Sequence, residues 1–144
     1  EALKSSMAEA AEERGEKGRY AATLSRSIAE PFLASSERRD LREKVFKAFA
    51  KRGENGGKTD NTDVIARTLK LRSEKARLLG YASYAALKLD DTMAKSPEAV
   101  QDLLQPVWQK AREKAAEDEK DLARLAAREG QNQPIAPWDW RYYA

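Results

Sequence analysis

The stretch that decides the fold is SPEAVQDLLQPVWQKAREKAAEDEKDLARLAARE, residues 96–129. It opens with a serine that can cap a helix, a proline at the first helical position and an acidic residue in the first turn. Apolar side chains then recur at helical spacing: Val100, Leu103, Leu104, Val107, Trp108 and Ala111. We expect one helix over about 97–129, which at 1.5 Å per residue would be about 50 Å long. Pro106 has no N–H to donate, so it predicts a kink in that helix.

The sequence on either side of this stretch also predicts helices, whereas strand signals are weak. Helical periodicity and capping residues place them at about 2–14, 28–34, 36–52, 62–79 and 83–89. Ser36 is the expected cap of the third helix. Pro31 is expected to limit the second helix at its N-terminal end. The prediction is an all-α fold, an irregular helical bundle with one long kinked helix, formed by a single helical segment over residues 1–144.

Composition excludes several classes of function. Charged residues make up 35% of the chain and hydrophobic residues 41%, and no apolar run approaches the roughly 20 residues of a membrane-spanning helix. The 27 basic and 24 acidic residues are interleaved, whereas a nucleic-acid binder gathers its basic residues on one face. We therefore expect a cytoplasmic protein that binds neither membrane nor nucleic acid.

The chain has no histidine and no cysteine, which bears directly on catalysis. Without them it cannot form a typical zinc site or a Ser-His or Cys-His nucleophile. The adjacent acids Asp90 and Asp91 diverge on most backbones, so they do not form a converging carboxylate pair. The glycine-rich loop at 53–58 lacks the spacing of a phosphate-binding loop. We assign no catalytic residue and no metal ligand, and leave substrate-binding residues unassigned.

Five residues are expected to have structural roles. The tail at 137–144, PWDWRYYA, carries four aromatic residues: Trp138, Trp140, Tyr142 and Tyr143. So much ring surface is unusual at a free terminus, and the chain starts, at Glu1, within an expected helix. We therefore expect a chain that is truncated at both ends. We also expect the aromatic tail to be exposed and prone to bind other surfaces. Arg72 falls on the apolar face of the 62–79 helix, and we expect it to pair with a carboxylate.

Several stretches together carry a family resemblance. They are DLREKVFKAF at 40–49, DNT at 60–62, LRSEKARLLGYASYA at 71–85, MAKSPE at 93–98 and PWDWRYY at 137–143. In this order they resemble the thimet oligopeptidase family of zinc metallopeptidases. The Trp-Asp-Trp form of the tail is most similar to its bacterial peptidyl-dipeptidase (dipeptidyl carboxypeptidase) branch.

The resemblance implies a two-lobed, almost entirely helical hydrolase whose deep channel admits short peptides. The branch releases dipeptides from C-termini, using a zinc ion held by a His-Glu-x-x-His helix and a downstream Glu. None of these residues is in this chain, since the motif would follow the tail. The resemblance thus implies an inactive fragment, part of scaffold and channel wall, whose parent protein binds zinc and an oligopeptide substrate. Its tail would pack against the remainder of the same chain.

Two alternatives remain open at this point. The chain could be a free-standing helical interaction module whose aromatic tail docks on a partner, or a small all-α enzyme that uses carboxylates only. A gene that ended near Ala144 and a cooperative monomeric melt would favour the module. The carboxylate enzyme needs two acids that converge in a pocket, and no such pair can be named from the sequence.

Overall fold

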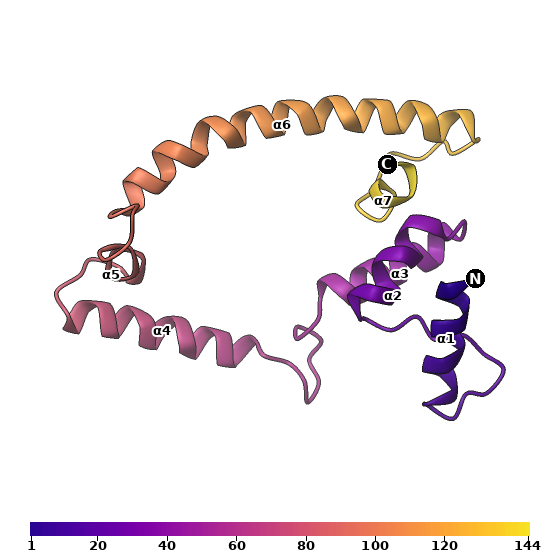
Figure 1. Cartoon of the computed structure of the whole chain (residues 1–144), viewed down its shortest axis with the longest axis horizontal. Helices are drawn as coiled ribbons and strands as arrows, with labels where there is room; N and C mark the ends of the chain where they lie inside the picture. The colour runs from indigo at the N-terminus through magenta and orange to yellow at the C-terminus, as the bar shows by residue number, and fades with distance from the viewer. The chain divides into compact units, whose positions relative to one another are not determined.

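The computed structural model describes all 144 residues and is all-α, with seven helices and no strand (Figure 1). The helices are α1 Ala2–Glu12, α2 Arg26–Ser35, α3 Arg39–Ala50, α4 Thr62–Leu78, α5 Tyr84–Leu89, α6 Pro97–Arg128 and α7 Trp140–Tyr143. The chain divides into two compact units. Unit 1 comprises residues 1–52 and 118–144, and unit 2 comprises residues 53–117, so that α6 contributes to both.

The centre of unit 1 is α2, which contacts α1, α3 and α7. The fully buried aliphatic side chains of α1 and α2 are Ala10, Ala11, Ile28, Ala29 and Leu33. The helix begins at Arg26 although Pro31 lies inside it, so the expectation that Pro31 limits its N-terminal end is wrong. A proline removes one backbone hydrogen bond, and the buried face that α2 presents to three other helices offsets this loss.

The start of α3 also differs from the expectation. Ser36 does not cap it, because Ser36 is the extended residue that ends α2 and its N–H donates to the carbonyl of Phe32. The residue before α3 is Arg38, which makes no capping bond with its side chain. The carbonyl of Ser36 instead accepts a hydrogen bond from Arg42, and this acceptor role could not be read from helix-capping rules.

Unit 2 has little core of its own. Within it α4 packs against α5 but not against α6, and the one fully buried aliphatic residue is Ala76. The corner between α4 and α5 is fixed by the Tyr81 hydroxyl, which donates to Asp90 at 2.7 Å. The hydroxyl of Ser96 accepts from the N–H of Ala99 at 3.2 Å, so Ser96 caps α6 as predicted. The helix continues through Pro106.

The loop between α3 and α4 is folded tightly on itself. Gly53 has a positive φ of 78°, and a Cβ atom there would lie 2.9 Å from the side-chain nitrogen of Asn61. Its carbonyl accepts from the N–H of Asn61 at 2.7 Å. The carboxylate of Asp60 accepts from the N–H groups of Gly56 and Thr62 at 2.7 and 2.9 Å. The positive φ of Gly53 therefore favours glycine at this position, and any other side chain there would also have to displace the side chain of Asn61.

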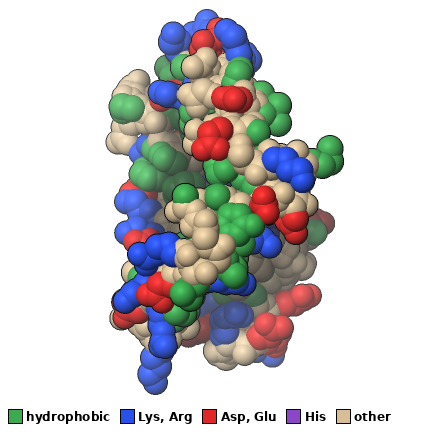
Figure 2. Space-filling view, turned by 90° about the vertical axis from the view of Figure 1, so that its left-hand side faces the viewer, with side chains coloured by type: hydrophobic (Ala, Val, Ile, Leu, Met, Phe, Trp, Pro, Cys, Tyr) green, Lys and Arg blue, Asp and Glu red, His purple; other side chains and the backbone are tan.

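Charges of both signs are mixed on the one face of the molecule that the space-filling view of Figure 2 displays. Figure 2 shows basic and acidic side chains interspersed, with hydrophobic side chains between them, on the face it displays. The formal net charge is +3. None of the helices combines the length and the apolar character that crossing a membrane requires.

Candidate functional site

The strongest concentration of buried charge joins α3 to the tail. Arg42 and Asp139 are each only 1% exposed, and they are the largest fully buried side chains of the chain. Arg39 completes the group. We call these three residues the Asp139 clasp. Because Arg39 and Arg42 are three residues apart on α3, they lie on the same face of the helix and can approach one carboxylate together.

Two guanidinium groups hold the Asp139 carboxylate. Arg39 donates through Nε to Oδ1 at 3.1 Å and through Nη2 to Oδ2 at 2.9 Å, which is a bidentate arrangement. Arg42 donates through Nη2 to Oδ1 at 2.9 Å. Charge-assisted bonds of this kind are about twice as strong as neutral ones, and the fork of arginine suits a carboxylate. The clasp thus fixes the tail in one position against α3.

The backbone of the tail is folded around the same carboxylate. The N–H of Ala136 donates to Asp139 Oδ2 at 3.0 Å, and the N–H of Asp139 donates back to the carbonyl of Ala136 at 2.8 Å. The carbonyl of Asp139 then accepts from the N–H groups of Tyr142 and Tyr143, both at 3.1 Å. Asp139 therefore closes a turn, starts α7 and binds α3 at once.

The remaining donors of the clasp are also used within unit 1. Arg42 donates to the carbonyl of Ser36 at 2.7 Å and to that of Trp138 at 3.3 Å, and its guanidinium lies 4.0 Å from the ring centroid of Tyr142. Arg39 also donates to the side chain of Gln133. The donors of both arginines are directed at the protein itself, as in a structural joint rather than a site for an anionic ligand.

The four rings of the tail are half-buried, so the expectation that they are exposed is wrong. Trp138 lies 6.2 Å from Phe46 between ring centroids, with the Lys47 ammonium 5.2 Å from its ring. Tyr142 and Tyr143 meet edge to face at 4.9 Å. Helices α2 and α7 are in contact. Other residues of unit 1 cover these rings, in part through cation–aromatic contacts that hydropathy does not reveal.

The pKa of Asp139 reports the balance of forces in the clasp. Burial by itself would raise it, but hydrogen bonds from Arg39 and Arg42 and from the N–H of Ala136 outweigh this, and the pKa lies below the ordinary 3.8. Asp139 is thus held as a carboxylate at neutral pH and cannot serve as an acid there.

A hollow of about 360 Å³ adjoins the clasp, bordered by Glu37, Glu129, Tyr142 and Tyr143 among others. Burial, and then the charge of Glu129, raise the pKa of Tyr143 above its ordinary value. The hollow contains no histidine or cysteine, and its two arginines are engaged by Asp139.

Arg72 is placed in unit 2 without the expected carboxylate. Its guanidinium lies 5.2 Å from the ring centroid of Tyr84 on α5, and no ion pair joins it to an acid. The expected carboxylate partner is therefore wrong. Arg72 is exposed, so water solvates its charge, and the ring of Tyr84 adds a cation–aromatic contact.

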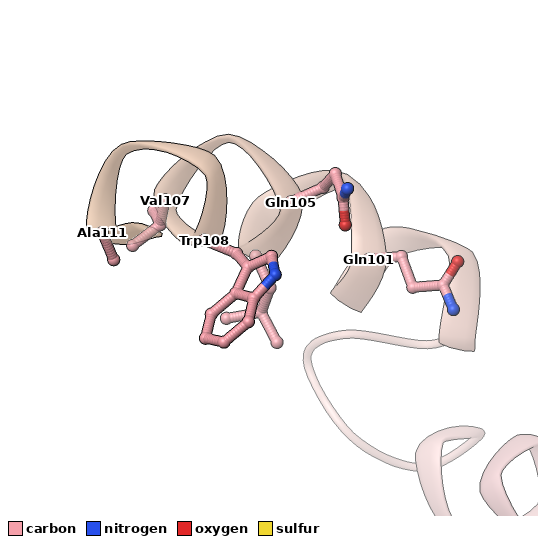
Figure 3. A pocket seen from close by; sticks show the side chains of 6 residues that line it. Gln101, Gln105, Val107, Trp108 and Ala111 are labelled. Atoms are coloured by element: carbon pink, nitrogen blue, oxygen red, sulfur yellow. The ribbon is translucent and has the colours of Figure 1, made fainter. Parts of the chain in front are cut away.

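A second hollow, of about 500 Å³, lies along α6 and is open to solvent. It is lined by Gln101, Leu104, Gln105, Val107, Trp108 and Ala111, none of them charged. Figure 3 shows the indole of Trp108 projecting from the helix, with Gln101 and Gln105 on the preceding turns. The structure gathers no three His, Cys, Asp or Glu side chains that could hold a metal ion.

The sequence indicates structural roles for the four rings of the tail but not for Asp139, the charged residue between Trp138 and Trp140. Asp139 lies 100 residues from Arg39 and 97 from Arg42, and no local pattern joins such distant positions. One signal was present: an acidic residue surrounded by apolar rings must find a partner, and the two arginines spaced three apart on α3 could provide it.

Comparison with known proteins supports the family resemblance. The pattern of Peptidase family M3 matches residues 32–144. The chain is 34% identical over 137 residues to the "Dipeptidyl carboxypeptidase" of Escherichia coli (strain K12), which covers 95% of this chain and 20% of that protein. It is 35% identical over 140 residues to the "Oligopeptidase A" of Haemophilus influenzae, covering 94% of this chain and 20% of the relative.

A plant relative gives a similar result. The "Probable cytosolic oligopeptidase A" of Arabidopsis thaliana is 33% identical over 129 residues, which is 88% of this chain and 18% of that protein. The chain thus spans about a fifth of the length of the curated relatives it matches. The family pattern covers most of the chain, including α3, the long α6 and the aromatic tail, and it confirms the resemblance seen in the sequence. The chain belongs to peptidase family M3.

Proposed function

We propose that this chain is a scaffold and channel-wall segment of a zinc-dependent peptidase that hydrolyses short peptides and releases C-terminal dipeptides. The names of two relatives, dipeptidyl carboxypeptidase and oligopeptidase A, support a peptide substrate. The share of the relatives that the chain covers, about a fifth, supports a part rather than a whole enzyme. The observation that carries the structural role is the Asp139 clasp, which uses its charges to join α3 to the tail.

The residues of this chain do not fit a zinc site. It has no histidine or cysteine, and its acids do not gather in threes. We therefore assign the zinc ligands and the water-activating base to the remainder of the polypeptide, and we derive no step of hydrolysis from these residues. What this chain contributes is a rigid joint in unit 1 and the long helix α6.

The wider setting follows from the same proposal. Residues 1–144 form one helical segment of a longer, two-lobed helical protein whose partners are an oligopeptide substrate and the remainder of the same chain. The protein acts in the cytoplasm and binds neither membrane nor nucleic acid. The name of the cytosolic plant relative and the mixed charge of the surface support this setting.

The test is an assay of the product of the full reading frame. Two N-acetylated oligopeptides of the same sequence are compared, one with a free C-terminal carboxylate and one amidated, each with and without a zinc chelator. We expect chelator-sensitive release of a dipeptide from the free-acid peptide and little from the amide. Equal internal cleavage of both would replace dipeptide release with oligopeptidase activity. Absence of chelator-sensitive cleavage would contradict the peptidase itself.

A further inference from the structure

We propose that another helix of the same, longer polypeptide packs on the apolar stripe of α6, which is formed by Leu103, Leu104, Val107 and Trp108. This inference rests on the proposed function, in that it takes the chain to be part of a larger peptidase. The sequence predicts that the aromatic tail packs against the remainder of the same chain, whereas the structure favours the long helix α6 for that contact.

The stripe is exposed and uncovered. Leu103 is 72% exposed, Val107 62% and Trp108 59%. These positions recur at the spacing of one helix face, so their side chains form one patch rather than scattered apolar residues. Within unit 2, α6 makes no contact with α4. A contiguous apolar patch of this kind on a helix normally meets a partner.

The tail does not compete for this role. Its rings are half-buried, and the Asp139 clasp holds it against α3 and α2. The stripe on α6 has no comparable arrangement, since Trp108 takes part in no ring or cation contact of the structure.

The chemistry of the hollow defines the partner. All six residues around its 500 Å³ are uncharged, and Gln101 and Gln105 supply amide groups at its rim (Figure 3). Leu104 and Trp108 are one turn apart, so the space between them suits a large apolar side chain inserted from a helix that crosses α6. The partner surface is therefore a helix with an aliphatic or aromatic stripe and no charge at its centre.

A second copy of the chain is a poorer fit. A fully exposed aromatic side chain offers roughly 150–250 Å². Three of the four stripe residues are smaller and aliphatic, so four side chains that are 55–72% exposed offer no more than roughly 600 Å² together. A stable association needs about 800 Å² from each partner. From Lys110 to Asp121 every residue of the helix is charged or alanine, so the stripe does not continue. The relatives, in contrast, are about five times longer than this chain, which leaves ample polypeptide to cover it.

The test uses cysteine reactivity in the product of the full reading frame. These 144 residues contain no cysteine, so Leu104→Cys adds a single thiol to this segment. The matched control is Gln109→Cys, five residues later and about 140° around the same helix. Each variant is treated with a maleimide, and labelling of the peptide that carries the new thiol is followed by mass spectrometry, so that cysteines elsewhere do not interfere.

We expect the thiol at position 104 to react at least tenfold more slowly than that at 109 in the native protein, and equally fast in denaturant. The slow rate should not depend on protein concentration or on added oligopeptide. Equal native rates at the two positions would overturn the proposal. Protection that vanished on dilution would replace it with self-association, and protection that required peptide would replace it with a substrate contact.

A second measurement guards against a variant that fails to fold. Hydroxyl-radical footprinting of the unsubstituted protein reports oxidation of Trp108 directly. We expect at least tenfold slower oxidation of Trp108 in the native protein than in denaturant, and near-equal rates would contradict the proposal. Neither of these two measurements requires enzymatic activity. Absence of chelator-sensitive cleavage would therefore refute the proposed function, whereas unprotected positions 104 and 108 would refute the proposed packing on α6.

Discussion

At the scale of single residues, Asp139 is a carboxylate that is only 1% exposed and accepts hydrogen bonds from Arg39, Arg42 and the N–H of Ala136. A buried ion pair is weak evidence for net stability, because desolvation of both charges cancels much of their attraction. Removing one partner is a different matter, since the other charge is then left buried without compensation. This applies above all to Arg42, which is 1% exposed, so its guanidinium cannot be solvated by water if Asp139 is neutralised.

Asp139→Asn should therefore destabilise unit 1 strongly. The amide keeps the shape of the carboxylate but loses the charge that balances Arg39 and Arg42, and we expect a loss of about 3 kcal/mol in the free energy of unfolding. Urea unfolding followed by circular dichroism measures it. The control is Asp40→Asn, which removes an exposed partner of Arg38 in the first turn of α3 and should lower the unfolding midpoint only slightly. Equal effects of the two substitutions would show that the clasp does not hold the tail.

The same residue predicts a dependence on pH. The pKa of Asp139 lies below 3.8 in the folded chain and at its ordinary value in the unfolded chain, so the folded state binds this proton more weakly. Its contribution to stability is complete above about pH 5 and is lost as pH falls through the folded pKa. The stability difference between the unsubstituted chain and Asp139→Asn should be constant from pH 7 to about 5 and shrink below pH 4. A difference that did not shrink at all as the pH fell from about 4 to about 2 would contradict this assignment.

Residue roles were the hardest part to predict from sequence. Arg72 was expected to need a counter-ion because hydropathy treats its charge as the only feature, yet the ring of Tyr84 provides the partner. The Asp139 clasp could not be predicted, because Asp139 lies 100 positions from Arg39 and 97 from Arg42. Local patterns identify which residues require a partner, while the partner itself is decided by tertiary packing.

At the scale of the helices, the start of α6 is stabilised by residues that are close to it in the sequence. The Ser96 hydroxyl accepts from the N–H of Ala99, and Pro97 follows at the first helical position. We expect Ser96→Ala to cost about 1 kcal/mol. Hydrogen exchange at residues 99–104 should become faster, whereas exchange at 120–128 should not change. The control Ser73→Ala, on the exposed side of α4, should have no destabilising effect, because alanine is the better helix former.

A loss of protection from hydrogen exchange spread evenly along α6 would contradict the role of Ser96 as a local cap.

The existence of the helices and the Ser96 cap could be predicted from the sequence, because both depend on residues within one or two turns. The extent of α2 and the start of α3 could not, because they depend on contacts with other elements. Pro31 is tolerated where buried side chains of α2 meet three helices, and Ser36 serves Arg42 rather than the following helix.

For the whole molecule, burial is distributed unevenly between the units. Unit 1 buries Ile28, Ala29 and Leu33 at the contacts of α2, together with the clasp. In unit 2, α4 has seventeen residues but buries only Ala76 completely. Isolated helices of this length are marginal in water, and most helical stability in proteins comes from tertiary packing.

This imbalance predicts that the 144-residue chain by itself protects α2 better than α4 from hydrogen exchange, although α2 is shorter and contains Pro31. We expect protection factors at least tenfold higher in α2, after correction by exchange rates in the unfolded chain, because opening of α2 requires loss of the unit 1 core. Leu33→Ala, which should cost about 3 kcal/mol at this buried position, should lower protection in α2 and leave α4 unchanged. If intrinsic helix propensity governed stability instead, α4 would be the better protected helix, and the substitution would not separate the two units.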